Sequence, residues 1–507
     1  MANSSFKQYA QENGGRVSLL FLLFLLALYQ FYKSGFPSFA IICMLPVLVL
    51  GVIYSFRYRM LLFWTLFFIN YVIMMRDLPV SLPTSLPNEA LELLLLGIAI
   101  IIVEDFPFQR INNLMFLTLG CWCVFCTIEI LNDTCNLGMN IGAWYTGARM
   151  MAFQLMYAFL VYTLYISNPE RLVQYLYVWG AFSLFAVFWV WKQKYLGLTP
   201  KESSWLFGRG RSTHVLYGGS LIRYFSVYSD AANFGIGIAS TAVAFIVFAI
   251  HAKIKKLRWF FLIVGIACAW GMFPSGTRTA IACFMAGMGF YVIMSKSIKI
   301  AIPFTAAFGI FVFILAFTTI GNGNQQIRRM RSAFDKNDAS ANQRTINQET
   351  MRKYMKDAPW GIGLGMGYDN VPANNKYRLM STIAPDSEYV FIWLRTGKIG
   401  LTTFLILTAI MLAGACWISL FTIKSNSLRG IGAGLCCAFV SQQLGGYGNQ
   451  VLMQFPNCLI FYGGLTIVYI LPHIEQEWVE YENSVLEKVA EKKRLKLEKK
   501  KAESLRK

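Results

Sequence analysis

The chain has 507 residues, of which 56% are hydrophobic and 14% are charged, and its formal net charge is +20. Soluble globular proteins average about 25% charged residues, so this composition excludes an ordinary soluble enzyme. Apolar stretches spread from residue 17 to residue 471 suffice for about a dozen membrane helices of roughly 20 residues each. In such a protein the excess of Lys and Arg orients the helices in the lipid bilayer, and it needs no nucleic acid as a partner.

The predicted fold class is all-α, a polytopic bundle of about fourteen transmembrane helices. The first apolar run, Val17 to Tyr32, is followed by Lys33 and Phe36 and lacks a small-residue cleavage motif, so we expect a retained helix. The spans are expected at residues 17–33, 36–56, 60–75, 89–103, 111–131, 143–166, 171–191, 228–250, 259–274, 279–294, 300–320, 397–423, 431–447 and 453–471.

Short loops set the expected orientation. If the N-terminus is cytoplasmic, every short loop on that side is basic, whereas the short loops at 132–142 and 447–453 carry no Lys or Arg. The even number of spans then leaves the C-terminus in the cytoplasm as well. There, residues 473–507 alternate Glu with Lys and Arg, which favours a solvated helix touching anionic lipid head groups over a protein-docking site.

The chain divides by composition into six parts, without an internal repeat. The missing repeat counts against a secondary transporter. The parts are N-terminal spans (1–191), a basic outer loop (192–227), central spans (228–320), a large, partly helical outer loop (321–396), C-terminal spans (397–472) and a charged cytoplasmic tail (473–507).

Eleven cysteines do not form a disulfide framework here, because ten of them lie within apolar stretches and only Cys135 falls in a predicted loop. Cys121 and Cys123 have no histidine or second cysteine pair nearby to complete a metal site. We therefore expect neither an intrachain disulfide nor a bound metal.

Both outer loops hold basic residues that orientation does not explain. Residues 192–227 carry six Lys or Arg, among them Arg209, Arg211 and Arg223, against the single acid Glu202. The second loop, which includes Arg344, is also rich in arginine. A basic surface above the bilayer suits an anionic partner such as a phosphate, a diphosphate or an acidic glycan.

Two more arginines are expected at this level of the membrane. Arg149 lies about two turns into the sixth span, and Arg278 lies at the outer mouth of the tenth. Such residues either face the bundle interior or a cavity, or extend to the interface. Asp230 and Asn233, at the start of the eighth span, either cap that helix or pair with one of the arginines.

The second outer loop contains an unusual glycine string. After Arg344 a helix is expected over residues 345–355, because helices end before a proline such as Pro359. Residues 360–367 then have glycine at alternate positions, which allows close approach to a ligand or to other backbone. The spacing excludes a dinucleotide-binding motif and leaves a structural turn as the alternative. Asp386 or Ser387 is expected to cap the next helix, whose first turn holds Glu388.

Taken in order, these strings resemble the O-antigen ligase and polymerase family of bacterial membrane glycosyltransferases. The family pattern runs from an arginine and a helix through P-x-G-x-G-x-G and H-N-x-Y/F-L to E-x-G-x-x-G. The corresponding positions here are Arg344, residues 359–365, residues 386–390 and residues 395–400. Upstream, residues 223–233 are similar to the family's R-x-x-G-x-F-x-D-P-N segment, and residues 275–278 to its S-x-S-R turn.

The resemblance implies a GT-C-like membrane enzyme in the bacterial inner membrane that works by inversion, without a metal or other cofactor. Its donor is then an undecaprenyl-diphosphate-linked oligosaccharide, used on the periplasmic face. The acceptor is a growing O-antigen or capsular glycan in a polymerase, or lipid A core in a ligase. A flippase for the same lipids is the competing class, which the missing repeats and the long outer loop disfavour.

The resemblance also implies roles for individual residues. Arginines would hold the diphosphate: the motifs support Arg223, Arg278 and Arg344, and location alone supports Arg149, Arg209 and Arg211. Family ligases place a histidine at the position of Asp386, which favours a polymerase here. A carboxylate can also accept a proton from a sugar hydroxyl, so the candidate bases are Asp386, then Glu388, then His214.

Overall fold

The computed structural model describes residues 14–34, 49–51, 53–54, 56–73, 86–102, 107–216, 219, 221–295, 302–303, 306, 309–310, 313–314, 317–321, 323, 325–331, 339–383 and 386–504. Over this part of the chain almost all secondary structure is helical. The strands described, β1 (Val215–Leu216) and β2 (Leu221–Ile222), form one short antiparallel hairpin in which Val215 lies opposite Ile222. The prediction of an all-α fold is confirmed.

Seven of the described helices are long and apolar enough to cross a membrane, so the prediction of a polytopic helical membrane protein is confirmed. The total of fourteen spans stays a prediction, because most of span 36–56 and about half of span 300–320 fall outside the described residues. The helices that coincide with predicted spans are α2 (Gly14–Ser34), α4 (Arg59–Phe68) with η1 (Ile69–Ile73), α5 (Leu86–Ile102), α7 (Leu114–Ile128) with η2 (Glu129–Leu131), α8 (Ile141–Ala148), η3 (Arg149–Phe153), α9 (Gln154–Tyr165), α10 (Pro169–Tyr195), α13 (Ala231–His251), α14 (Lys255–Gly271) with η5 (Phe273–Ser275), α15 (Arg278–Ser295), α20 (Glu388–Trp417) with η8 (Ile418–Thr422), α21 (Asn426–Gly448) and α22 (Asn457–Ile470) with η9 (Leu471–Ile474).

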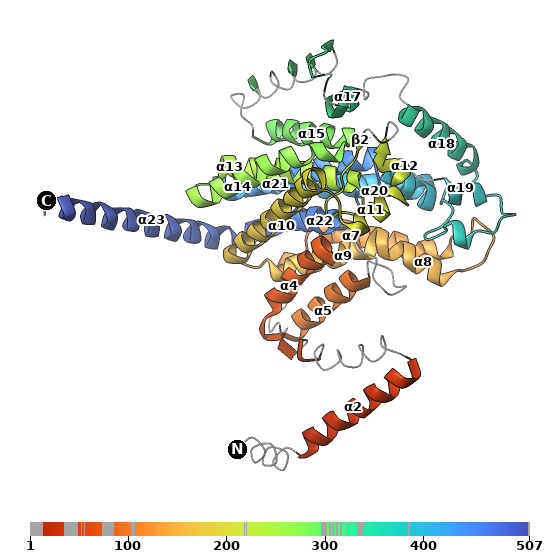
Figure 1. Ribbon diagram of the computed structural model, residues 1–507, viewed down its shortest axis with the longest axis horizontal. Helices are drawn as coiled ribbons and strands as arrows, with labels where there is room; N and C mark the ends of the chain where they lie inside the picture. The colour runs from red at the N-terminus through yellow and green to blue at the C-terminus, as the bar shows by residue number, and fades with distance from the viewer. Residues whose placement is uncertain are drawn as a thin grey trace.

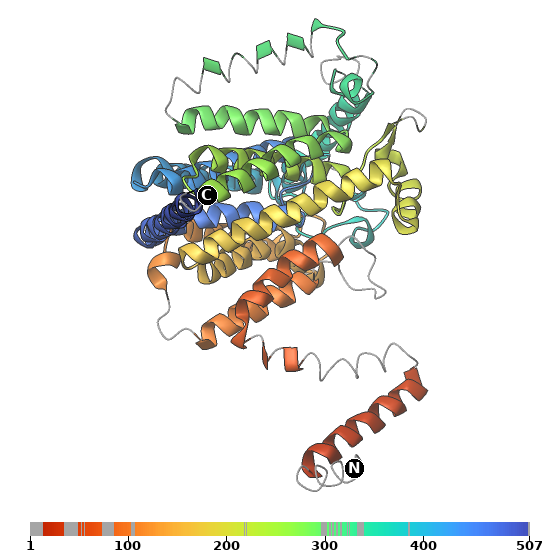
Figure 2. The same ribbon diagram turned by 60° about the vertical axis from the view of Figure 1, so that its left-hand side comes forward.

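The long helices lie side by side, with α15 on one flank of the bundle and α4 and α5 on the other (Figures 1 and 2). Helix α13 is central, since 18 of its 21 residues are buried. Its many Ala, Gly, Ser and Thr residues allow α14, α15 and α21 to pack closely against it. The Asp230 carboxylate accepts hydrogen bonds from the amides of Ala232 (2.7 Å) and Asn233 (2.9 Å), so the predicted helix cap is confirmed.

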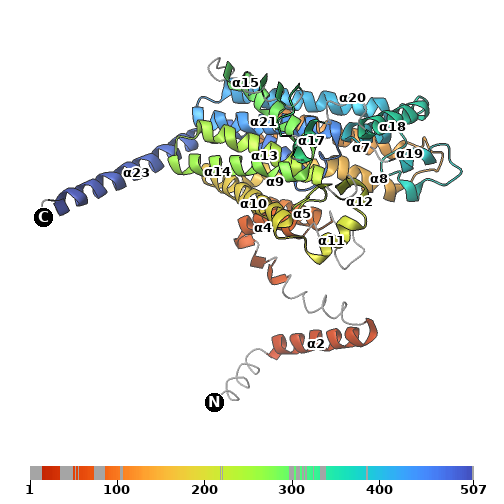
Figure 3. The ribbon, with the colours of Figure 1, turned by 45° about the horizontal axis from the view of Figure 1, so that its top comes forward.

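The two long loops contribute short helices at one end of the bundle, whereas α23 projects from the opposite end (Figures 1 and 3). The basic loops predicted to be cytoplasmic contact α23: Lys253 pairs with Glu482 at 2.7 Å, and Glu475 accepts the amide of Ser425 at 2.6 Å. The predicted sorting of loops onto two faces therefore agrees with the packing, and the side that is cytoplasmic stays a prediction. The helices outside the predicted spans are α6 (Phe108–Ile111), α11 (Pro200–Phe207), α12 (Arg211–His214), α17 (Gln325–Arg331), α18 (Ala339–Met355), η7 (Tyr368–Asn370), α19 (Arg378–Thr382) and α23 (Glu475–Ser504).

The start of α18 differs from the prediction. Helix α18 begins at Ala339, six residues before the predicted start at residue 345, so Arg344 lies within the helix and not before it. Alanine and glutamine in residues 339–343 favour a helix, and they extend it towards the N-terminus. The end at Met355, before Pro359, is as predicted.

Candidate active site

Two arginines from different loops hold the turn between α14 and α15. The Arg223 Nε donates to the Ser275 carbonyl (3.2 Å), and its Nη2 donates to Thr277 Oγ1 (2.9 Å). The Arg329 Nε donates to the carbonyl of Gly276 (2.7 Å). Gly276 has φ +56°, and a Cβ atom there would lie 3.2 Å from Arg223 Cγ, so glycine is needed for this close approach.

Arg223 belongs to a cluster of four arginines. The pKa of Arg223 is lowered to about 10, mainly by burial and also by the charges of Arg329, Arg278 and Arg344, while the Asp230 carboxylate opposes the shift. The three arginines that the motifs support are therefore brought together. The fourth, Arg329, was not singled out from the sequence, because no motif fixes its position.

The C-terminal end of α21 brings Arg344 close to the start of α20. The Arg344 Nη2 donates to the Gly448 carbonyl (2.9 Å), and Ser387 Oγ donates to the Gly446 carbonyl (3.0 Å). The last carbonyls of a helix lack intrahelical partners and carry the negative end of its dipole, so they attract such donors. Arg344 and Asp386, the neighbour of Ser387, consequently flank the same helix end.

The loop that follows α21, residues 449–456, connects the motif strings to one another. Its bonds reach the start of α15, the start of α20 and the segment before α13. They are Asn449 Nδ2 to Thr279 Oγ1 (3.2 Å), Leu452 N to Glu388 Oε2 (2.9 Å) and Ser229 Oγ to Gln454 Oε1 (2.7 Å). Strings predicted separately therefore meet around one loop.

The two carboxylates predicted as bases differ in their surroundings. Glu388 is 2% exposed, and its Oε2 accepts the amide of Leu452, so this side chain fastens the 449–456 loop to α20. Asp386 lies in the turn before α20 and is half-buried, so it is partly accessible to solvent. The geometry favours Asp386 as the group available to a substrate.

His214, the third candidate base, caps a helix. Its Nε2 accepts the amide of Ala231 (3.0 Å), and its Nδ1 lies 3.2 Å from the Gly210 carbonyl, which assigns the proton to Nδ1. Burial, together with the charge of Arg223, lowers the pKa of His214 to about 4, although Asp230 opposes this shift. The ring is thus neutral near pH 7, with both nitrogens engaged.

His214→Gln is expected to remove a pH-dependent part of the stability and to retain transfer activity. The unfolded chain binds a proton on His214 below about pH 6.5, whereas the folded protein does so only below about pH 4. The free energy of unfolding of the wild type should therefore decrease as the pH falls from about 6.5 to about 4. In the variant this decrease should be smaller. Unfolding of both proteins in detergent at pH 7 and pH 5 measures this difference, and equal losses would contradict the capping role.

The three arginines supported by location alone differ in their surroundings. Arg149 is 6% exposed, and its Nε lies 3.0 Å from Glu89 Oε1, which also accepts a hydrogen bond from Gln154 (2.9 Å). Arg149 therefore faces the bundle interior, the first of its two predicted alternatives. Arg209 lies two residues before α12 and Arg211 is its first residue, and both are exposed.

The glycine string forms a turn that docks onto the bundle. Gly361, Gly363 and Gly365 have φ values of +80°, +100° and +73°, and Gly397 has φ +67° at a bend within α20. The Gly363 amide donates to the Arg395 carbonyl (3.1 Å) beside that bend. These backbone conformations favour glycine, so the string positions the second outer loop on the bundle.

Gly365→Ala is expected to lower the unfolding temperature by several degrees. A Cβ atom at position 365 would lie 1.7 Å from the Ala143 carbonyl oxygen, and the positive φ adds strain. Gly367→Ala is the matched control, because its φ is −100° and the nearest heavy atom would be 4.0 Å away. Thermal unfolding of the two variants in detergent should separate them, and equal midpoints would contradict the docking role.

Within the described part of the chain, no group of three or more His, Cys, Asp or Glu residues could hold a metal ion. The ten cysteines described are all free thiols.

Comparison with known proteins gives a family match over part of the chain. No curated protein matches the chain. A family model described as O-antigen ligase matches residues 263–405, a stretch that contains Arg278, Arg329, Arg344 and Asp386. The match agrees with the resemblance inferred from the motifs: residues 263–405, which include several of the apolar helices, are similar to the O-antigen ligase family.

Proposed function

We propose that the protein is a membrane glycosyltransferase that polymerises O-antigen or capsular glycan from undecaprenyl-diphosphate-linked repeat units on the periplasmic face of the bacterial inner membrane. The observation that carries the proposal is the convergence of Arg223, Arg278, Arg329 and Arg344 around one turn and one helix end. Guanidinium groups bind phosphate oxygens in pairs and keep their charge, so this cluster suits a diphosphate.

In this scheme Asp386 accepts the proton of the acceptor hydroxyl. The hydroxyl oxygen attacks the anomeric carbon of the donor, and the bond from that carbon to the diphosphate oxygen breaks with its electron pair. The arginines stabilise the negative charge on the departing undecaprenyl diphosphate. This single displacement inverts the anomeric configuration and, as the family resemblance implies, uses no metal or cofactor.

The hydrogen bonds and ion pairs of the predicted site residues suggest which of them bind substrate and which stabilise the structure. We assign the diphosphate to Arg223, Arg278 and Arg344 and add Arg329. Arg149 stabilises the bundle through Glu89, and Glu388 positions the 449–456 loop.

The competing functions differ in a measurable way. A ligase would transfer the glycan to lipid A core, and a flippase would move the lipid-linked sugar without changing it. Asp386, which stands where family ligases have histidine, favours the polymerase.

The purified protein in detergent, supplied with the lipid-linked repeat unit of its own host, is expected to elongate the glycan with no membrane barrier present. Gel and mass analysis of the products measures this. Unchanged substrate would contradict an enzyme and favour a flippase, whereas transfer only to added lipid A core would show a ligase. A heat-denatured sample is the control.

A further inference from the structure

A cavity of about 970 Å³ lies between α10, η1 and α11, on the same side as the first outer loop. Its volume is at the upper end of the range of about 300–1,000 Å³ typical of small-molecule sites. Five aromatic side chains line it: Tyr71, Phe185, Trp189, Trp205 and Phe225.

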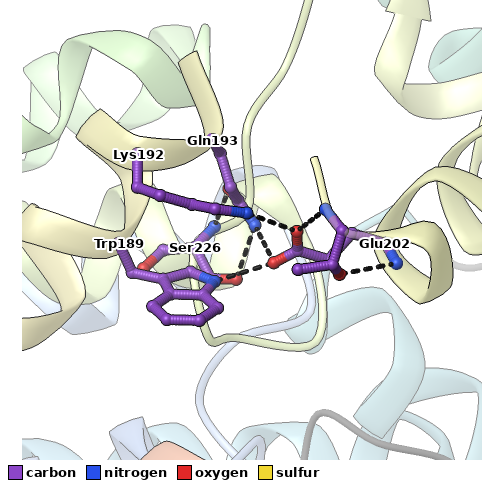
Figure 4. Close-up of polar contacts among 6 residues, drawn as sticks. Trp189, Lys192, Gln193, Glu202 and Ser226 are labelled. Atoms are coloured by element: carbon purple, nitrogen blue, oxygen red, sulfur yellow. Dashed lines mark hydrogen bonds and ion pairs between the residues drawn. The ribbon is translucent and has the colours of Figure 1, made fainter. Parts of the chain in front are cut away.

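The wall between α10 and α11 is fixed by one carboxylate (Figure 4). Glu202 Oε1 accepts Trp189 Nε1 (2.7 Å) and Gln193 Nε2 (2.9 Å), and Oε2 accepts the Thr199 amide (2.6 Å) and pairs with Lys192 (3.5 Å). Burial would raise the pKa of Glu202, but these hydrogen bonds outweigh it and hold the pKa below its usual value. Each oxygen of the Glu202 carboxylate has two partners, so this side chain has a structural role and holds the Trp189 ring in position.

The lining suits a sugar better than a lipid tail. Aromatic rings alternate with polar groups, among them Lys201, Ser204, Arg209 and Ser229. A pyranose has apolar C–H faces, which stack on aromatic rings, and hydroxyl edges, which need hydrogen-bond partners. Sugar hydroxyls can use these polar groups as hydrogen-bond partners, whereas a polyprenyl chain has no polar group to offer them.

The cavity adjoins the arginine cluster. Ser229 lines the cavity, and the next residue, Asp230, acts on Arg223. On the same side Trp205 packs against the ring of His214 at a centroid distance of 4.9 Å, and the chain from His214 leads to Arg223 through the β1–β2 hairpin. A glycan seated in the cavity would therefore end beside the proposed diphosphate site.

We propose that this cavity binds the acceptor end of the growing glycan, and that this glycan carries acidic sugars. The inference rests on the proposed function and extends it to the acceptor. The exposed cations Lys201 and Arg209 line the cavity but lie outside the cluster around Arg223, so they supply positive charge to the glycan itself.

Ser204→Trp tests the cavity. This exposed residue of α11 lines it, so an indole there would occupy the acceptor's place, and transfer should fall at least tenfold. Donor lipid that co-purifies with the protein, measured by mass spectrometry, should be unchanged. Ser212→Trp, exposed on α12 and outside the cavity lining, is the matched control and should be active.

Normal transfer by Ser204→Trp would overturn the cavity assignment, and so would loss of its co-purifying donor, which would make the polyprenyl chain the occupant. No transfer by the wild-type protein would instead refute the proposed function.

The charge of the glycan is tested separately. The double variant Lys201→Gln/Arg209→Gln should raise the KM for the acceptor severalfold, whereas the control Lys194→Gln/Arg211→Gln, with the same loss of charge, should not. Sugar analysis of the host's polymer should find uronic or other acidic residues. A neutral polymer, or equal KM values in the two double variants, would overturn this part of the inference.

Discussion

Arg344→Lys is expected to slow glycan transfer at least about 100-fold while the protein still inserts and purifies normally. One Nη of Arg344 donates to the Gly448 carbonyl at 2.9 Å, which orients the guanidinium and leaves its other donors for a diphosphate. Lysine preserves the charge, but a single ammonium cannot hold the helix end and paired phosphate oxygens in the same way. The initial rate of elongation in detergent measures the loss.

Arg352→Lys is the matched control, because Arg352 is an exposed residue of the same helix, α18. Its rate and chain length should equal those of the wild type. Co-purifying donor should decrease in Arg344→Lys and not in Arg352→Lys. A normal chain length in Arg344→Lys would contradict the diphosphate role of the cluster.

Hydropathy and loop charge predicted most of the fold. Apolar runs of about 20 residues gave the positions of α7, α10, α13 and α22, because a membrane helix must be apolar along its length. They did not show which helix is central. Helix α13 takes that place through small residues that let its neighbours approach, a property of pairs of helices that one apolar sequence does not reveal.

The motifs predicted which arginines belong to the site but not what those arginines contact. Arg223, Arg278 and Arg344 lie in sequence strings of fixed spacing, and these strings resemble the motifs of the family. The partners of these arginines are mostly backbone carbonyls, such as those of Ser275 and Gly448, which any residue type provides. Sequence patterns carry no information about such contacts.

Two other contacts could not be predicted from the sequence, because they join residues that lie far apart in the chain. The pair of Arg149 with Glu89 joins different spans, and nothing in either local sequence identifies the partner. Likewise, the sequence alone makes Glu388 a candidate base. In the fold its carboxylate accepts a hydrogen bond from the Leu452 amide, which lies 64 residues away in the chain. Burial and partners, which only the packed bundle supplies, separate Glu388 from Asp386.

Asp386→Asn is expected to reduce transfer by about 10²–10⁴-fold, because an amide cannot accept the proton of the acceptor hydroxyl. Asparagine has nearly the same shape, so the turn before α20 should be preserved, and co-purifying donor should stay at the wild-type level. Glu388→Gln is the matched comparison. Its amide oxygen can still accept the Leu452 N–H, so transfer should stay within about tenfold of the wild type.

The two variants together decide which carboxylate acts as the base. The measurement is the rate of a single transfer in detergent with saturating donor, so that chemistry and donor binding are separated. If Asp386→Asn remained active while Glu388→Gln lost transfer and kept its thermal stability, the role would move two residues along the chain. Such a result would require the 449–456 loop to release Glu388 when the acceptor binds, because its carboxylate is buried against Leu452 in the structure.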